Sequence, residues 1–324
     1  MNKAELPNYI LITPARNEAQ FIGFTLDSMV QQTFRPLKWI VVSDGSTDGT
    51  DDIVRKYAQT YPWIEILRMQ ERDERHFAGK ADAFNAGYRE AKKLCPDIVG
   101  NLDADVSFGP ELFEYLLTKF AGDPELGVGG APYRQGSGHY NYKFSNIENV
   151  WGGCQLFRRE CFEDIGGYLP LRKGSIDLIA VVTARMKGWK TRTFVNKVCV
   201  HHRKTGTGEH GALRAKFELG AKDYRVGNHP VWEFFRTLYQ ISQPPFLVGA
   251  IALSAGYAWS VVKREERPVS SEFIAFAQHE QFQRLRRLWE TILSDGPNFL
   301  RPRRPDSAVN DTYSSVGSRQ SSSK

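Results

Sequence analysis

Asn101-Leu102-Asp103-Ala104-Asp105 follows the apolar pair Ile98-Val99 and places two carboxylates one residue apart. A buried strand reaches water at its carboxyl edge, so Asp103 and Asp105 are expected to project into a crevice there. Paired carboxylates suit Mg²⁺ or Mn²⁺, which bind one or two protein carboxylates together with substrate phosphates. A solvated turn with an Asx cap fits the same residues, so the pair needs support from the rest of the chain.

Short β-branched runs alternate with helical patterns throughout the first hundred residues. The expected strands are Tyr9 to Thr13, Trp39 to Ser43, Ile64 to Arg68 and Ile98 to Asp103. Between them lie amphipathic segments, of which the first places Phe21, Ile22, Thr25, Leu26 and Met29 on one helical face. This alternation predicts an α/β fold with a mostly parallel, Rossmann-like sheet flanked by helices.

The pattern changes after Asp105. A helix with its apolar face between Leu112 and Phe120 is expected first, followed by an aromatic segment over 132–148 with little periodicity. Unpatterned segments of that length are uncommon unless they bind a ligand. A further helix over 177–187 and two short strands ending at His201-His202 complete the expected domain. A helical region is then predicted over 206–300, and a disordered tail over 302–324.

Composition narrows the class of protein. The 324 residues carry a net charge of +6, and much of the excess lies late, in Lys263-Arg264, Arg284 to Arg287 and Arg301 to Arg304. This distribution suits phosphate groups or an anionic membrane surface better than a nucleic-acid duplex. The four cysteines show no zinc-site spacing, and no apolar leader precedes the first strand. A cytoplasmic protein is therefore expected, either free or at the inner face of the cell membrane.

The segment from Pro245 to Val262 is free of charge and precedes Lys263-Arg264. Its length is close to that of a membrane span, but its glycines and serines make it only moderately apolar. An interfacial helix and a helix packed on the protein's own surface are the alternatives.

Four segments together resemble the nucleotide-binding half of family 2 glycosyltransferases. They read TPARNE at 13–18, VSDGSTDGT at 42–50, GKADAFNAG at 79–87 and LDAD at 102–105. The resemblance covers residues 7–205, and it is closest to enzymes of bacterial cell-surface polysaccharide assembly. It implies a GT-A fold and a metal-dependent, inverting transferase that uses a nucleotide-diphosphate-sugar with Mg²⁺ or Mn²⁺.

The resemblance also implies roles for individual residues on the donor side. The turn that holds the nucleotide comprises Pro14, Ala15, Arg16 and Glu18. Asp44 would accept a hydrogen bond from the base, although it also suits a turn that precedes a helix. Lys80 would reach a phosphate, because a lysine at a helix start is otherwise slightly unfavourable. Asp103 would lie near the ribose and the metal, and Asp105 would bind the metal directly.

The acceptor side is expected from Gly152 onward. In the family, an Asp that opens a helix some ten residues before a Gly-aromatic pair is the general base, and Asp177 holds that position before Gly188-Trp189. Ile176 replaces the usual Glu before it, and an N-terminal helix cap is the alternative role for Asp177. His201 or His202 would complete the metal shell, since strand alternation turns only one of them inward. Arg203 would assist at the diphosphate, and the glycine-rich 204–211 would close over it.

Two other kinds of function fit the same residues. A nucleotidyltransferase uses a similar crevice but needs no base at Asp177, and a non-catalytic nucleotide-sugar-binding scaffold needs neither. No nucleic-acid partner is expected. The acceptor is expected to be a glycan or a lipid-linked glycan, and the aromatic residues that suggest it are Tyr133, Tyr140, Tyr142, Phe144 and Trp151.

Overall fold

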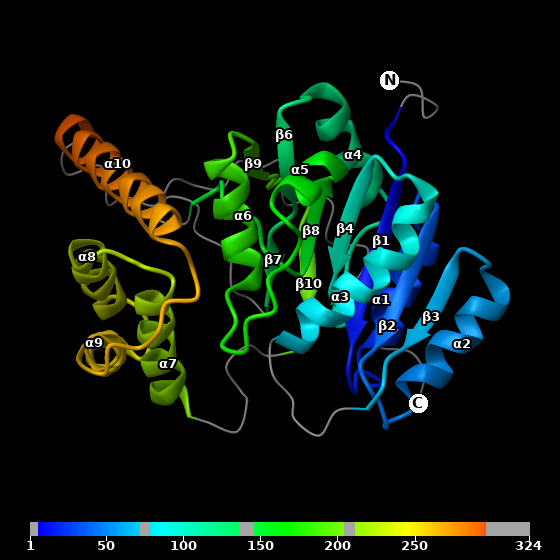
Figure 1. Cartoon of the computed structure of the whole chain (residues 1–324), viewed down its shortest axis with the longest axis horizontal. Coiled ribbons are helices and arrows are strands. Elements are labelled where there is room, and N and C mark those ends of the chain that lie inside the picture. The colour runs from blue at the N-terminus through cyan, green and yellow to red at the C-terminus, as the bar shows by residue number, and fades with distance from the viewer. Residues whose placement is uncertain (1–5, 72–77, 136–145, 204–210, 296–324) are drawn as a thin grey trace. The chain divides into compact units, whose positions relative to one another are not determined.

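A computed structural model describes residues 6–71, 78–135, 146–203 and 211–295 (Figure 1). The chain divides into two compact units, residues 1–279 and 280–324. Among its described residues the second unit contains the end of one long helix.

The central sheet has seven strands among the described residues, in the order β3-β2-β1-β4-β8-β6-β9. Strands β1 to β4 run parallel, whereas β8 is antiparallel to both of its neighbours. The fold is therefore the mostly parallel α/β sheet predicted from the sequence. The strand bounds are β1 Tyr9–Ala15, β2 Lys38–Ser43, β3 Ile64–Arg68, β4 Ile98–Leu102, β6 Leu126–Gly130, β8 Cys154–Arg158 and β9 Lys190–Thr193.

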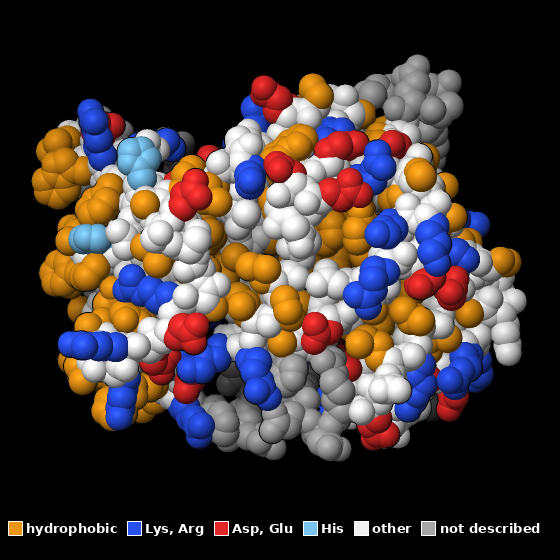
Figure 2. Space-filling view, in the orientation of Figure 1, with side chains coloured by type: hydrophobic (Ala, Val, Ile, Leu, Met, Phe, Trp, Pro, Cys, Tyr) orange, Lys and Arg blue, Asp and Glu red, His pale blue; other side chains and the backbone are white. Residues whose placement is uncertain are grey.

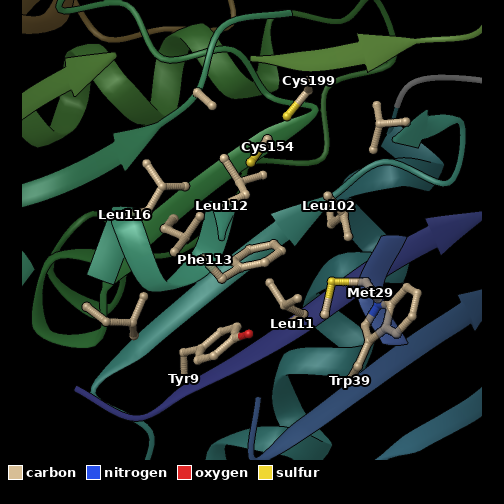
Figure 3. Packing of buried hydrophobic residues seen from close by; sticks show 14 of the residues in the cluster. Tyr9, Leu11, Met29, Trp39, Leu102, Leu112, Phe113, Leu116, Cys154 and Cys199 are labelled. Carbon is tan, nitrogen blue, oxygen red and sulfur yellow. The ribbon is translucent and has the colours of Figure 1, made fainter. Parts of the chain in front are cut away.

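Helices cover both faces of this sheet, and alternation along β1 shows the two layers. Tyr9 and Leu11 point into a cluster with α1, α2 and α4, while Ile10 and Ile12 point into a cluster with α3, α5 and α6. Figure 3 shows the first cluster, in which Leu11 and Trp39 pack with residues of α1 and α4. The helix bounds are α1 Ile22–Val30, α2 Thr50–Thr60, α3 Ala78–Ala91, η2 Lys92–Leu94, α4 Leu112–Gly122, α5 Arg159–Asp164 and α6 Ile176–Met186.

A second, three-stranded sheet forms beside the end of β4. It contains β5 Val106–Ser107, β10 Cys199–His201 and β7 Tyr133–Arg134, in that order. Because β10 pairs antiparallel with β5, His201 lies opposite Val106. A residue nearly a hundred positions downstream is thereby brought next to the carboxylates that follow β4.

The helices α7 Ala212–Arg225, α8 Pro230–Ile241, α9 Phe246–Val262 and α10 Ser271–Asp295 follow the sheet. Apolar residues of α6 pack against the start of α10 through Val182, Phe273 and Ala277. Helix α9 coincides with the uncharged segment noted in the sequence. Within the described ranges, none of the helices combines the length and the hydropathy that a membrane crossing requires.

Candidate active site

The turns after β1 and β2 lie side by side and brace each other. Ala15 and Ser43 are register partners, and the Ala15 carbonyl accepts a hydrogen bond from the Asp44 N–H at 2.8 Å. The Arg16 guanidinium lies 3.7 Å from the Asp44 carboxylate, and Glu18 N–H donates to Thr50 Oγ1 at 2.8 Å. The residues of these two turns, which the resemblance assigns to the nucleotide, therefore lie together at the carboxyl edge of the sheet. Pro14 is one of them and lies near the end of β1.

Lys80 and Asp103 form an ion pair at the carboxyl edge of the sheet. Lys80 comes from the first turn of α3, and Asp103 follows β4 directly. Burial alone would lower the pKa of Lys80, but Asp103, and then Asp177 and Asp105, raise it above the usual lysine value. Burial also raises the pKa of Asp103, with Lys80 opposing that change. Asp103 therefore pairs directly with the ammonium group, and the charges of Asp177 and Asp105 also act on it.

The Asp105 carboxylate contacts two basic side chains, His201 and Arg203. Its Oδ2 is 3.3 Å from His201 Nε2 and accepts a hydrogen bond from Arg203 Nε at 3.2 Å. Arg203 also pairs with Glu18, so one guanidinium joins the β1 turn to the carboxylate after β4. Although burial opposes it, the hydrogen bonds and charges of His201 and Arg203 lower the pKa of Asp105. The same hydrogen bond with Asp105 raises the pKa of His201.

The two neighbouring histidines face different surroundings, as strand alternation predicts. The His201 ring packs edge-on against both Tyr133 and Trp151, which pack against each other, and it reaches Asp105. The His202 ring stacks on Phe24 at 4.4 Å, and its Nε2 is 2.8 Å from Ser107 Oγ. Burial lowers the pKa of His202. Of the two, His201 is the one that the fold brings to the carboxylates.

Asp177 lies in the first turn of α6, next to the segment that precedes β8. Gly152 N–H donates to Asp177 Oδ2 at 3.3 Å, and a Cβ at Gly152 would lie 2.7 Å from the Asp177 Cβ. Only glycine lets the backbone approach the carboxylate this closely. On the other side of the same segment, the Gly153 carbonyl accepts from Asp103 N–H at 2.9 Å. Residues 152 and 153 therefore connect Asp177 with Asp103.

Sequence reasoning missed two residues of this site and one contact of a third. The Asn101 side chain donates to the Gly152 carbonyl, and Gln135 Nε2 donates to the Arg203 carbonyl and lies 3.4 Å from His201 Nδ1. Glu18 was assigned to the nucleotide, but its bond to Arg203 was not foreseen. Asn101 stood inside the quoted motif and could have been considered, whereas nothing marks Gln135. Three of the predicted acceptor aromatics, Tyr140, Tyr142 and Phe144, and most of the predicted loop at 204–211 lie outside the described residues.

The oxygen and nitrogen atoms that this site offers as metal ligands suit a divalent cation. Asp105, in the turn before β5, and His201, at the end of β10, offer an oxygen and a nitrogen ligand, and Asp103 is two residues from Asp105. Within the described residues, no three His, Cys, Asp or Glu side chains gather into a complete metal-binding group. Mg²⁺ and Mn²⁺ commonly complete their shell with water and substrate phosphates, so a protein pair is sufficient. We therefore judge that the residues fit such an ion.

The fold and these motifs define a class of protein. Residues 10–166 match the family model described as Glycosyl transferase family 2. This part of the chain is therefore similar to family 2 glycosyltransferases, and its fold is the GT-A fold. The match ends before Asp177 and His201, so the candidate base and the candidate histidine ligand lie beyond it.

Particular relatives agree with this class. The chain is 28% identical over 149 residues to a poly-β-1,6-N-acetyl-D-glucosamine synthase of Staphylococcus aureus, with 46% of this chain and 34% of that protein covered. It is 29% identical over 153 residues to the probable glycosyltransferase YdaM of Bacillus subtilis, with 46% and 35% covered. The chain thus spans about a third of the length of these relatives.

One solved structure is similar over most of the chain. It is the mannosyltransferase PcManGT from Pyrobaculum calidifontis in complex with GDP-Man and Mn²⁺. The TM-score is 0.57 at 22% identity, and the alignment covers 89% of this chain and 84% of that one. This likeness concerns the fold.

Proposed function

We propose that this chain transfers a sugar from a nucleotide-diphosphate-sugar to an acceptor hydroxyl, with inversion at the anomeric carbon. The proposal rests on one observation, which is the pair of hydrogen bonds made by the adjacent backbone groups of Gly152 and Gly153. One of these residues hydrogen-bonds the Asp177 carboxylate, and the other hydrogen-bonds the backbone of Asp103. A donor-side and an acceptor-side carboxylate are thus held at a fixed separation, as a reaction between two bound substrates requires.

The donor side stabilises a leaving diphosphate. Asp105 and His201, with Asp103 beside them, would hold Mg²⁺ or Mn²⁺, which when bound neutralises charge on the diphosphate oxygens. Lys80 and Arg203 supply fixed positive charge at the same edge of the sheet, and their present partners Asp103 and Glu18 hold both side chains in place. The Arg16 to Glu18 turn and Asp44 would hold the nucleoside.

The acceptor side supplies one base. Asp177 takes the proton of the acceptor hydroxyl while that oxygen attacks the anomeric carbon, and the Gly152 N–H orients its carboxylate. A single displacement of this kind inverts the configuration and needs no second carboxylate as nucleophile. Tyr133 and Trp151, whose ring centroids are 4.4 Å apart, would form an aromatic wall for an acceptor sugar.

The acceptor that we favour is a lipid-linked glycan in cell-surface polysaccharide or glycolipid assembly. Two observations support this choice: one relative is named as a polysaccharide synthase, and the uncharged α9 is followed by Lys263 and Arg264. Peripheral contact with the inner face of the cell membrane would bring the enzyme to such an acceptor.

A nucleotide-release assay tests the proposal. GDP-Man and UDP-GlcNAc are incubated with the full chain, Mn²⁺ and a panel of octyl glycosides, and glycosylated products are identified by mass spectrometry. We expect transfer that EDTA stops, and a loss of at least about a hundredfold in Asp105→Asn, because charge neutralisation at the leaving group is removed. Asp52→Asn, in the exposed first turn of α2, is the control and should remain active.

The assay also separates the competing functions. Release of sugar 1-phosphate with transfer of the nucleotide would identify a nucleotidyltransferase. Donor binding without any turnover on the whole panel, in the presence of Mn²⁺, would favour a binding scaffold. Either result would contradict the proposal.

A further inference from the structure

Helix α8 buries polar side chains and exposes apolar ones. Glu233 and Gln240 are buried, at 4% and 7% exposed, and Arg236 and Thr237 lie on the same side at helical spacing. The opposite side carries Phe234 at 59% exposed, together with other exposed apolar residues, namely Val231, Phe235, Leu238, Tyr239 and Ile241. A helix on the surface of a water-soluble protein normally buries its apolar side chains and exposes its polar ones.

Specific bonds fix α8 in this rotation. Arg236 donates to Asp223 Oδ1 of α7 at 2.7 Å, and Lys216 of α7 donates to Gln240 Oε1 at 2.7 Å. Thr237 Oγ1 lies 3.0 Å from Ser254 Oγ of α9. Rotating α8 to bury its phenylalanines would break these bonds and leave buried polar groups unpaired.

Close backbone packing fixes α9 as well. A Cβ on Gly220 of α7 would lie 1.9 Å from the Leu253 carbonyl oxygen of α9, and one on Gly256 would lie 1.9 Å from the Phe217 carbonyl oxygen. The two backbones are in direct contact, so the helix cannot rotate freely. The outward side of α9 therefore keeps large apolar residues in solvent, namely Phe246, Leu247, Val248, Ile251, Trp259, Val261 and Val262.

The charge distribution matches this orientation. From Pro230 to Val262 the only charged residues are Glu233 and Arg236, and both lie on the inward side of α8. The exposed Lys263 and Arg264 follow immediately, and Lys263 Nζ is 5.0 Å from the Trp259 ring. Figure 2 shows orange side chains along the left edge of the molecule, where Figure 1 places α8 and α9. A tryptophan beside cations at the end of an apolar face is typical of a membrane interface.

We infer that the outward side of α8 and α9, called here the hairpin face, docks into the headgroup and acyl boundary of an anionic lipid bilayer. This goes beyond the single segment at 245–262, because α8 contributes half of the face and its buried polar side sets the orientation. A second copy of the chain fits less well, since the hairpin face offers no carboxylate to meet Lys263 and Arg264. The purpose of this docking, which is access to a lipid-linked acceptor, rests on the proposed function, whereas the docking itself does not.

Vesicle flotation of the full chain tests the inference. Vesicles of phosphatidylcholine alone are compared with vesicles that also contain phosphatidylglycerol. We expect the wild type to float with the anionic vesicles, and the double variant Phe234→Glu/Ile251→Glu to bind at least about tenfold more weakly, because two apolar side chains are replaced by charges. Lys263→Ala/Arg264→Ala should bind both kinds of vesicle alike. The control is Leu94→Glu, at a residue that is also exposed, at 45%, but lies on η2 beside the sheet, and it should float as the wild type does.

Three results would overturn the inference. The wild type would stay in the lipid-free fraction with both kinds of vesicle, or the double variant would float as well as the wild type. The third is a dimer in solution that the double variant disrupts while neither protein floats. Nucleotide release with a water-soluble octyl glycoside, measured on the same proteins, keeps the two proposals apart: flotation without transfer would count against the proposed function alone.

Discussion

Two isoleucines show that one part of the first unit buries its apolar side chains whereas another part exposes them. Ile12 of β1 is fully buried between the sheet and α3, whereas Ile251 of α9 is 60% exposed. The sheet places its carboxylates at an edge and its apolar residues inside, while the hairpin of α8 and α9 does the opposite. The difference is the one that the inferred docking requires, in which the sheet region folds against water and the hairpin face would meet a second, apolar phase.

Matched truncations on the two regions should give the largest difference in stability. Leu11→Ala in β1 leaves a cavity in the core and should lower the free energy of unfolding by about 2–5 kcal/mol. Ile251→Ala removes a side chain that is already in solvent, so a change within about 0.5 kcal/mol is expected. Urea unfolding monitored by circular dichroism measures both. Similar losses in the two variants would show that the hairpin face is covered by protein in solution.

A methyl group at Gly152 should affect the reaction and not the folding of the sheet region. Gly152→Ala places a Cβ 2.7 Å from the Asp177 Cβ and 2.9 Å from its Oδ2, which displaces the carboxylate. We expect turnover to fall by about tenfold to a hundredfold, because small misplacements of a reacting group carry costs of that order. Donor affinity, measured by calorimetry, should change little.

Gly109→Ala is the matched control, since no heavy atom of the described chain beyond the two neighbouring residues lies within 4 Å of the added methyl group. Equal turnover in Gly152→Ala and the wild type would mean that the position of Asp177 does not matter for the reaction.

A buried acid in the hairpin region should give a smaller, pH-dependent effect. Burial raises the pKa of Glu233 from 4.5 to about 8, with Asp223 of α7 adding to the shift and Arg236 opposing it, and Tyr257 of α9 also feels this charge. The folded protein therefore keeps a proton that the unfolded chain releases, so the free energy of unfolding falls as pH rises from 4.5 to about 8.

Glu233→Gln removes the titration and should flatten this slope. At alkaline pH the variant should be more stable than the wild type by about 1–3 kcal/mol, because a buried carboxylate without hydrogen-bond partners in the described structure is removed. Thermal melts across the pH range measure it, and Glu218→Gln on the exposed side of α7 is the control. Parallel pH profiles of Glu233→Gln and the wild type would contradict the assignment.

The sequence predicted the sheet region well because its signals are local. Short β-branched runs between helical patterns defined β1 to β4, and the carboxyl ends of parallel strands meet at one edge of the sheet. The position of Asp44, Asp103 and Asp105 at that edge follows from this rule. The fold prediction is confirmed, while the roles of these residues in binding and catalysis stay predictions.

Other features depend on contacts between distant segments. Whether His201 or His202 faces Asp105 is decided by the antiparallel pairing of β10 with β5. The contact of Gln135 with Arg203 depends on the neighbouring pairing of β7 with β10, and no local pattern encodes either. The reversed burial of α8 was missed because a helical stripe of apolar residues is normally assigned to the protein interior.

Donor binding and turnover, measured side by side in two aspartate variants, test the central claim most directly. That claim gives Asp105 a role in holding the donor and Asp177 a role in activating the acceptor within one cleft. With GDP-Man or UDP-GlcNAc and Mn²⁺, Asp105→Asn should lose both binding and turnover. Asp177→Asn should bind the donor as the wild type does while its turnover falls by about a hundredfold or more. Unchanged turnover in Asp177→Asn would contradict the account.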